Sequence, residues 1–273
     1  EGVKNYKVGE RVFVSHHVPC NTCHYCLHGQ HTACEVLHTT NYFPGGFSEY
    51  IRVPKVNVES GVLVLPEEVS FEEGTFIEPL ACVVRAQRIA QLQSGQSVFI
   101  LGSGISGLLH LLLARVQGAG RIVITDINEF RLGLAQKLGA DRVVSADKDV
   151  IGQFKEVNDN RLADSVIVCT SNIRAFNQAL QAVGRGGTIL CFAPTEPGVN
   201  LAIPVNDFWR SNIKIIHSYG AGPQDLKEAL ELLRLRKVSV KELITHRLKL
   251  KDIALGFKLV AEAKDCIKVI IEP

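Results

Sequence analysis

The sequence predicts an α/β protein in which a β-rich domain is interrupted by a domain built on a doubly wound parallel sheet. Three observations support this prediction. The chain changes from short β-type runs to alternating strands and helices, and then changes back. A glycine-rich turn lies between a strand and a helix of the middle part, and four cysteines crowd between residues 20 and 34. Of the 273 residues 46% are apolar, so a core can form without disulfides.

The first part of the chain, residues 1–79, is predicted to contain short strands and turns. Residues 11–14 and 47–53 have the β-branched and aromatic composition of strands, and Pro44, Gly45 and Gly46 form a turn before the second. From residue 71 to 92 the apolar residues recur at helical spacing. Pro79 is expected to interrupt this helix, because proline lacks the N–H that a helix interior needs.

The middle part, residues 80–218, alternates strands and helices. Its apolar runs of strand length are 97–102, 121–126, 141–146, 164–169, 187–192 and 213–219, and its helical segments are 105–120, 128–140 and 175–184. Apolar strands flanked by helices indicate a parallel sheet covered on both faces. In the last part, residues 219–273, two amphipathic helices (225–237 and 252–264) precede a closing strand (266–273). The predicted domains are therefore 1–79 with 219–273, and 80–218.

The glycine-rich turn is the first candidate site. Its motif is G-x-G-x-x-G, formed by Gly102, Gly104 and Gly107. Glycine permits a tight turn, close approach of the backbone to a pyrophosphate, and close packing of helix on strand. The pyrophosphate would lie on the N–H groups that open the helix, around Ile105 and Ser106. An ordinary flexible loop is the alternative, but the strand–turn–helix context favours a dinucleotide site.

Asp126 ends the next apolar strand, 19 residues after Gly107. A carboxylate there accepts the ribose hydroxyls of NAD and repels a 2′-phosphate. Ile127 follows, and no adjacent Arg is available for NADP. We therefore expect NAD as the cofactor, with Ile127 and Arg131 also near it. The alternatives are a solvated Asp126 that caps the following helix, and an Arg131 that lies on a solvated helix face.

Four cysteines form the second candidate site: Cys20, Cys23, Cys26 and Cys34. Four thiolates close a tetrahedron around Zn²⁺ with no open position, as in a structural zinc site. Disulfides are disfavoured at this spacing, and an iron–sulfur cluster remains the minor alternative. Six histidines lie in the same region (His16, His17, His24, His28, His31 and His38), and we interpret most of them as exposed loop residues because four thiolates already saturate one zinc.

Composition excludes several partners. Lys and Arg number 30 against 28 Asp and Glu, and no Lys or Arg occurs between Arg11 and Arg52, so the cysteine-rich region is not expected to bind nucleic acid. The most apolar stretch, 98–116, contains His110 and Arg115 and is too interrupted to span a membrane. We expect no signal peptide, because the first residues (Glu1, Gly2, Val3 and Lys4) lack an apolar segment. The other four cysteines are scattered through apolar runs, which is typical of a reducing compartment. We expect a cytoplasmic protein.

Several motifs together resemble the zinc-containing medium-chain alcohol dehydrogenase family, nearest its sorbitol and threonine dehydrogenase branch. In chain order they are the cysteine-rich lobe, FSEYIRVP, IEPLACVVRA, GSGISG, ITD, GRGGTI, ITHRL and CIKVII. The resemblance covers essentially the whole chain. It implies a GroES-like catalytic domain interrupted by a Rossmann domain, with NAD-linked oxidation of a small alcohol or polyol at a second, catalytic zinc in the cleft between them. It also implies a homo-oligomer, either a dimer or a tetramer.

The resemblance further implies a catalytic role for Glu78, in IEPL, at or beside the catalytic zinc. A turn carboxylate before a proline is the alternative. The family takes its catalytic Cys and Gly-His-Glu ligands from a segment upstream of the cysteine-rich lobe, and here no Cys or His precedes His16. The chain contains no Met and begins at Glu1. We therefore expect a fragment that lacks that segment and is itself inactive.

Two other functions remain open from the sequence. One is a non-catalytic NAD-binding protein of the same fold, and the other is a zinc-free quinone reductase-like member of the superfamily. The four cysteines and Glu78 disfavour the second. The sequence does not identify the alcohol that would be the substrate.

Overall fold

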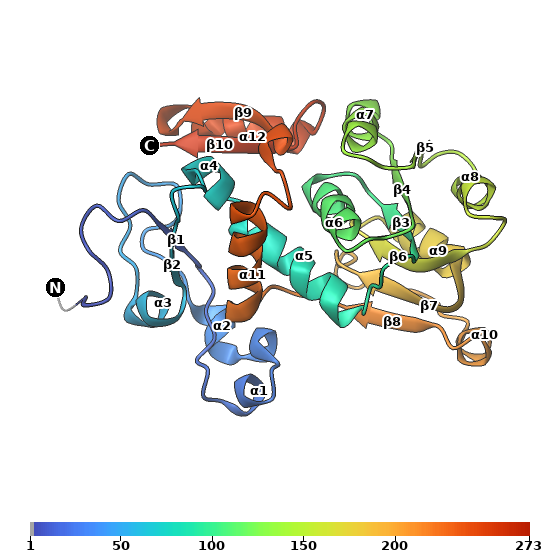
Figure 1. Ribbon diagram of the computed structural model, residues 1–273, viewed down its shortest axis with the longest axis horizontal. Coiled ribbons are helices and arrows are strands. Elements are labelled where there is room, and N and C mark those ends of the chain that lie inside the picture. Colours follow the sequence, from blue (N-terminus) through green and yellow to red (C-terminus); the bar gives the residue numbers. More distant parts are fainter. Residues whose placement is uncertain (1–2) are drawn as a thin grey trace. The chain divides into compact units, whose positions relative to one another are not determined.

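The computed structural model describes residues 3–273 and divides into two compact units (Figure 1). The first unit comprises the chain up to Cys82, then Gly220–Lys258 and Val269–Pro273. The second comprises Val83–Tyr219 and Leu259–Lys268. The structure has the α/β architecture expected from the sequence. Segments with short strands and helices flank one continuous run of alternating strands and helices.

The first unit contains short elements. Its strands form two two-stranded sheets. One pairs β1 (Val12–Val14) with β2 (Val62–Val64) in antiparallel orientation, and the other pairs β9 (Ile244–Lys249) with β10 (Lys268–Glu272). Its short helices are α1 (His24–Leu27), α2 (Glu35–Thr39), α3 (Lys55–Ser60) and α4 (Phe71–Gly74), with the 3₁₀ turns His31–Ala33, Lys241–Leu243 and Leu250–Asp252. The longer α11 (Pro223–Arg234) lies wholly in it, while α5 (Ile77–Ile89) and α12 (Ile253–Glu262) run from this unit into residues of the second.

Two sequence predictions for the first unit are wrong. Residues 47–53 do not form a strand, and the segment makes only an isolated antiparallel bridge between Phe43 and Arg52. Tyr50 is 87% exposed, so the β-type composition of this segment has no sheet to pack on. Pro79 does not interrupt its helix either. It lies in the first turn of α5, where a missing N–H has no intrahelical acceptor to lose.

The second unit is a six-stranded sheet in the order β5-β4-β3-β6-β7-β8, in which all neighbouring strands are parallel. The strands are β3 (Ser97–Leu101), β4 (Arg121–Asp126), β5 (Arg142–Ser145), β6 (Ala163–Val168), β7 (Val183–Cys191) and β8 (Lys214–His217). The chain order reverses between β3 and β6. In such sheets ligands bind beyond the carboxyl ends of the strands at this switch point.

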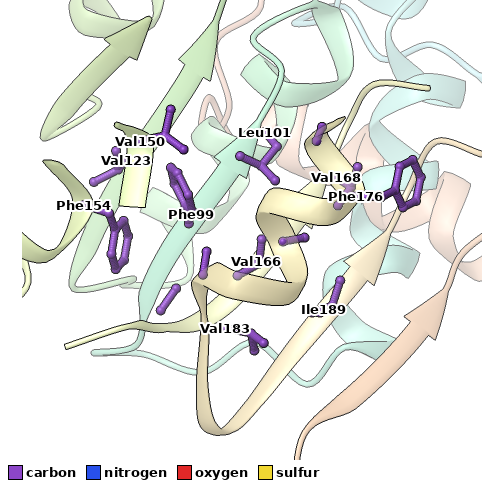
Figure 2. Close-up of a cluster of buried hydrophobic side chains, with 14 of the residues drawn as sticks. Phe99, Leu101, Val123, Val150, Phe154, Val166, Val168, Phe176, Val183 and Ile189 are labelled. Carbon is purple, nitrogen blue, oxygen red and sulfur yellow. The ribbon is translucent and has the colours of Figure 1, made fainter. Parts of the chain in front are cut away.

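Helices and a continuous apolar core hold the sheet in place. The helices of this unit are α6 (Ile105–Val116), α7 (Glu129–Lys137), α8 (Val150–Val157), α9 (Ile173–Ala182) and α10 (Val205–Arg210). Figure 2 shows side chains of β3, β6 and α9 in one cluster, in which the Phe99 and Phe154 rings lie 4.9 Å apart. All five residues of β3 are buried. The turn that follows β3 therefore starts from a rigid support.

Between residues 3 and 273 no helix combines the length and the apolar character that crossing a bilayer requires.

Candidate functional site

The four predicted metal-binding cysteines come together. Their sulfur atoms all lie within 4.8 Å of one another, and no other group of three or more candidate metal ligands does so among residues 3–273. The Sγ atoms are 4.0 Å apart between Cys20 and Cys26, 3.5 Å between Cys23 and Cys26, and 3.6 Å between Cys34 and Cys20. A tetrahedral ion with Zn–S bonds of about 2.3 Å separates its sulfurs by about 3.8 Å. The set therefore fits one zinc ion.

The short helices around the cysteines position their sulfur atoms. Helix α1 begins after Cys23 and places Cys26 on its buried side, while Cys34 precedes α2 and is 1% exposed. Backbone N–H groups of Thr22 and Cys23 donate to the Cys20 sulfur at 3.5 and 3.3 Å. The Thr22 hydroxyl and backbone N–H lower the pKa of Cys20 to about 6, whereas burial raises the pKa of Cys26 to about 12. All four sulfurs could be ionised together only with a cation between them.

The glycine-rich turn has the geometry that the motif predicts. Gly102 has φ +101°, a conformation that residues with a side chain rarely adopt. A Cβ on Gly107 would lie 1.9 Å from the Gly102 carbonyl oxygen, so only glycine permits this approach of α6 to the turn. Gly104 is the N-cap of α6. The N–H groups of Ile105, Ser106 and Gly107 are therefore first-turn donors at the amino end of a 12-residue helix.

Asp126 lies at the carboxyl end of β4 and is 8% exposed. Its Oδ2 accepts the Ser103 N–H at 2.7 Å and its Oδ1 accepts the Asn128 N–H at 3.0 Å. The alternative of a solvated helix cap is wrong, because the side chain of Asn128 caps α7. Asp126 thus joins the glycine-rich turn to the end of β4, and each carboxylate oxygen keeps a further lone pair for a hydroxyl donor.

Arg131 is not on a solvated helix face. It is half-buried, and its Nη1 lies 3.7 Å from where a Cβ on Gly104 would be. Its Nε is buried and has no hydrogen-bond partner in residues 3–273. Gly102, Gly104, Asp126, Ile127 and Arg131 all line one cavity of about 240 Å³.

The same cavity has lining residues that sequence reasoning missed. They come from the loops after β5 and β6 and from α9: Ala146, Asp147, Cys169, Thr170, Asn172, Arg174, Ala175 and Gln178. The Asp147 carboxylate pairs with the Arg174 guanidinium at 3.7 Å. The available signal was positional, because these loops follow strands β5 and β6 at the same edge of the sheet as the glycine-rich turn.

Glu78 lies in the first turn of α5 and is half-buried. The Cys82 thiol, one turn later, lies 3.3 Å from its Oε1. Burial and then the negative charge of Glu78 raise the pKa of Tyr42 to about 12. Burial and the neighbouring His16 lower the pKa of His17, while Glu78 opposes that shift. Glu78 therefore has His17 and Tyr42 near it, but the described residues do not form a set of three metal donors around it.

Two family models match the chain. Residues 1–65 match the alcohol dehydrogenase GroES-like domain, and residues 106–234 match the zinc-binding dehydrogenase model. The first lies in the unit that contains the four cysteines. The second begins inside the glycine-rich turn.

Curated relatives align with nearly the whole chain. An L-idonate 5-dehydrogenase of Vitis vinifera is 31% identical, covering 98% of this chain and 74% of that protein. A sorbitol dehydrogenase of Bacillus subtilis is 28% identical, covering 99% and 76%. An L-threonine 3-dehydrogenase of Idiomarina loihiensis is 28% identical, covering 94% and 74%.

Solved structures of dehydrogenases have the same fold. A zinc-binding dehydrogenase of Sinorhizobium meliloti 1021, bound to NADP, has a TM-score of 0.88 at 24% identity, covering 99% of this chain and 79% of that one. A short chain alcohol dehydrogenase of Escherichia coli CFT073, complexed with NADH, also has a TM-score of 0.88, at 21% identity, covering 100% and 80%. At these identities the similarity concerns the fold alone.

Proposed function

The chain belongs to the zinc-type alcohol dehydrogenase family, and from this premise we propose that it is the cofactor-binding and zinc-lobe part of an NAD-dependent dehydrogenase of small secondary alcohols or polyols. The observation that supports this most strongly is the cavity in which the glycine-rich turn, Asp126 and Arg131 meet. The relatives named as sorbitol and L-idonate dehydrogenases support the substrate class.

The residues of the cavity and of the amino end of α6 have distinct roles in this proposal. The N–H groups of Ile105, Ser106 and Gly107 bind the pyrophosphate at the amino end of α6, as helix N-termini favour anions. The guanidinium of the half-buried Arg131, whose Nη1 lies beside Gly104, adds a positive charge there. Asp126 accepts the ribose hydroxyls, and Ile127 covers the adenosine side. Bound NAD would supply a hydride acceptor, and in a form of the protein with a complete catalytic zinc site the metal would supply a Lewis acid for the alcohol oxygen.

The four-cysteine cluster is proposed to hold a structural zinc. Four thiolates leave no open position for a substrate, so the ion would stabilise the lobe and take no part in chemistry. This cluster disfavours the zinc-free quinone reductase alternative. We keep residues 1–79 with 219–273, and 80–218, as the proposed domains. Cytoplasmic location and a homo-oligomer, either a dimer or a tetramer, also remain proposals.

Cofactor preference provides the first test. Asp126→Ala should weaken NAD binding by roughly one to two orders of magnitude, because a lost charged hydrogen bond costs about 1.5–3 kcal/mol. NADP binding should change less, since the same carboxylate repels its 2′-phosphate. Calorimetry with both cofactors measures this. Asp147→Ala, an exposed aspartate on the same cavity, is the control and should retain most NAD affinity. Equal affinity of the unmodified protein for NAD and NADP would contradict the role of Asp126.

Glu78 provides the second test. The described residues offer no set of three metal donors around it, so residues 1–273 alone are expected to bind NAD without oxidising an alcohol. In a form of the protein with a complete catalytic zinc site, Glu78→Ala should lower turnover by about 10–100-fold, as residues at or beside a metal site typically do. NAD affinity should be nearly unchanged, because Glu78 does not line the cofactor cavity.

A non-catalytic role for Glu78 predicts a different result. If Glu78 is only a turn carboxylate, stability falls while turnover per folded, zinc-loaded molecule stays at the wild-type value. Glu59→Ala, at an exposed carboxylate of α3, controls for the loss of charge. Alcohol oxidation by residues 1–273 alone would contradict the proposal that these residues bind NAD but lack a complete catalytic zinc site.

A further inference from the structure

Helix α1 and its C-cap residue place two histidines on the solvent side. His24 and His28 are separated by one helical turn, and both are exposed. Their ring centroids lie 4.3 Å apart, with the ring planes tilted by 40°. Residues at positions i and i+4 lie on the same side of a helix. The two imidazole rings are therefore neighbours on the same side of this helical turn.

A backbone contact sets the tautomer of His28. Its Nδ1 lies 2.7 Å from the His24 carbonyl oxygen. A carbonyl oxygen can only accept, so Nδ1 carries the proton, and in the neutral ring Nε2 keeps its lone pair. Metal-binding histidines commonly donate their second ring N–H to a backbone carbonyl in this way, which orients the ring and increases its basicity. His28 thus already has the outer hydrogen bond of a metal ligand.

The spacing of the pair does not depend on the ion that it would bind. The N–H groups of Leu27 and His28 donate to the Cys23 and His24 carbonyls at 3.0 and 3.2 Å. On the opposite side of the same helix, Cys26 packs in the buried cluster with Cys34 and Leu37. This helical turn therefore presents the Cys26 thiol to the interior and the two imidazoles to the solvent.

We propose that His24 and His28 form a second metal site on the zinc lobe, which binds one exchangeable divalent transition-metal ion through two imidazole nitrogens. Imidazole suits Zn²⁺, Ni²⁺ and Cu²⁺, whereas Mg²⁺ and Ca²⁺ prefer oxygen ligands. Water would complete the coordination, because both rings are exposed. The ion would exchange readily, unlike one enclosed by four thiolates. This site is separate from the proposed dehydrogenase function and does not depend on it.

The test uses protein that retains its own tightly bound metal, with zinc content measured by elemental analysis before and after titration with Ni²⁺. We expect calorimetry to show one Ni²⁺ bound per chain with no release of zinc. Loss of an outer-shell partner already weakens metal sites by about 10–100-fold, so His24→Gln or His28→Gln, each losing a ligand, should weaken Ni²⁺ binding at least about tenfold. His31→Gln and His217→Gln, at histidines of the same chain outside the pair, should bind Ni²⁺ like the unmodified protein.

A spectroscopic measurement identifies the ligands. Cu²⁺ bound at the site should show coupling to imidazole nitrogens in its electron paramagnetic resonance spectrum, and this coupling should change in either variant. The His16 and His17 rings, with centroids 4.0 Å apart, are the competing location in the lobe. The proposal is overturned if Ni²⁺ binds only as zinc is released. It is equally overturned if His24→Gln and His28→Gln bind as tightly as the unmodified protein, or if His17→Gln alone abolishes binding.

Discussion

Cys23→Ser is expected to lose its bound zinc and to unfold the lobe around residues 20–34. The Cys23 sulfur lies 3.5 Å from that of Cys26, so its removal opens one corner of the tetrahedron. A serine hydroxyl does not ionise at neutral pH and is a poor zinc ligand. Structural zinc contributes about 10–16 kcal/mol to the folding of zinc-finger peptides, so this is the largest effect that we predict.

Elemental analysis and thermal unfolding measure this effect together. The unmodified chain should contain one firmly held zinc, and the variant should contain close to none and melt at a lower temperature. Cys191→Ser makes the same chemical change at a buried cysteine of β7, outside the lobe. That control should lose some stability but keep its zinc. An undiminished zinc content in Cys23→Ser would show that the four sulfurs do not bind the ion.

Gly107→Ala is expected to disrupt the cofactor cavity and the second unit together. The new Cβ would lie 1.9 Å from the Gly102 carbonyl oxygen, which is backbone and cannot rotate away. Overpacking of this kind costs about 1–3 kcal/mol of unfolding free energy. The turn must shift away from α6, so the N–H groups that would bind the pyrophosphate move with it. NAD affinity should therefore fall, by about tenfold for each 1.4 kcal/mol of binding free energy that is lost.

A matched substitution separates this clash from the general effect of adding a methyl group to a helix. Gly133 lies in α7 of the same unit, and a Cβ there meets nothing within 4 Å. Gly133→Ala should raise the unfolding free energy by about 0.5–1 kcal/mol, since alanine is the better helix former. Urea unfolding and NAD calorimetry on both variants provide the measurement. If Gly107→Ala keeps wild-type stability and affinity, the glycine is not required for close packing.

Local patterns predicted the parts of the structure that local forces determine. The turn around Gly102 was predictable because a buried strand, glycines at fixed spacing and an apolar helix are all short-range features. The four cysteines were predictable for the same reason, since their spacing alone brings the sulfurs within reach of one ion. In both cases the residues that act together are close in the sequence, at 102–107 and at 20–34.

Segments that depend on a distant partner were not predictable. Residues 47–53 have the composition of a strand, yet a strand forms only where a neighbouring strand offers its hydrogen bonds, and here just Phe43 and Arg52 pair. Pro79 was expected to break a helix. Helix α5 instead begins at Ile77, two residues before the proline. Pro79 therefore lies in the first turn, where its missing N–H removes no intrahelical hydrogen bond.

The sequence by itself determined the fold class, the four-sulfur cluster and the glycine-rich turn. Only the tertiary structure decided that Asp126 binds the Ser103 N–H, that Arg131 lies half-buried beside Gly104, and that Asp147 and Arg174 line the same cavity. These residues come from the turn after β3, from β4 and α7, from the loop after β5 and from α9. Their meeting follows from the order of strands in the sheet, which is set by the packing of helices on both its faces and not by any short pattern in the chain.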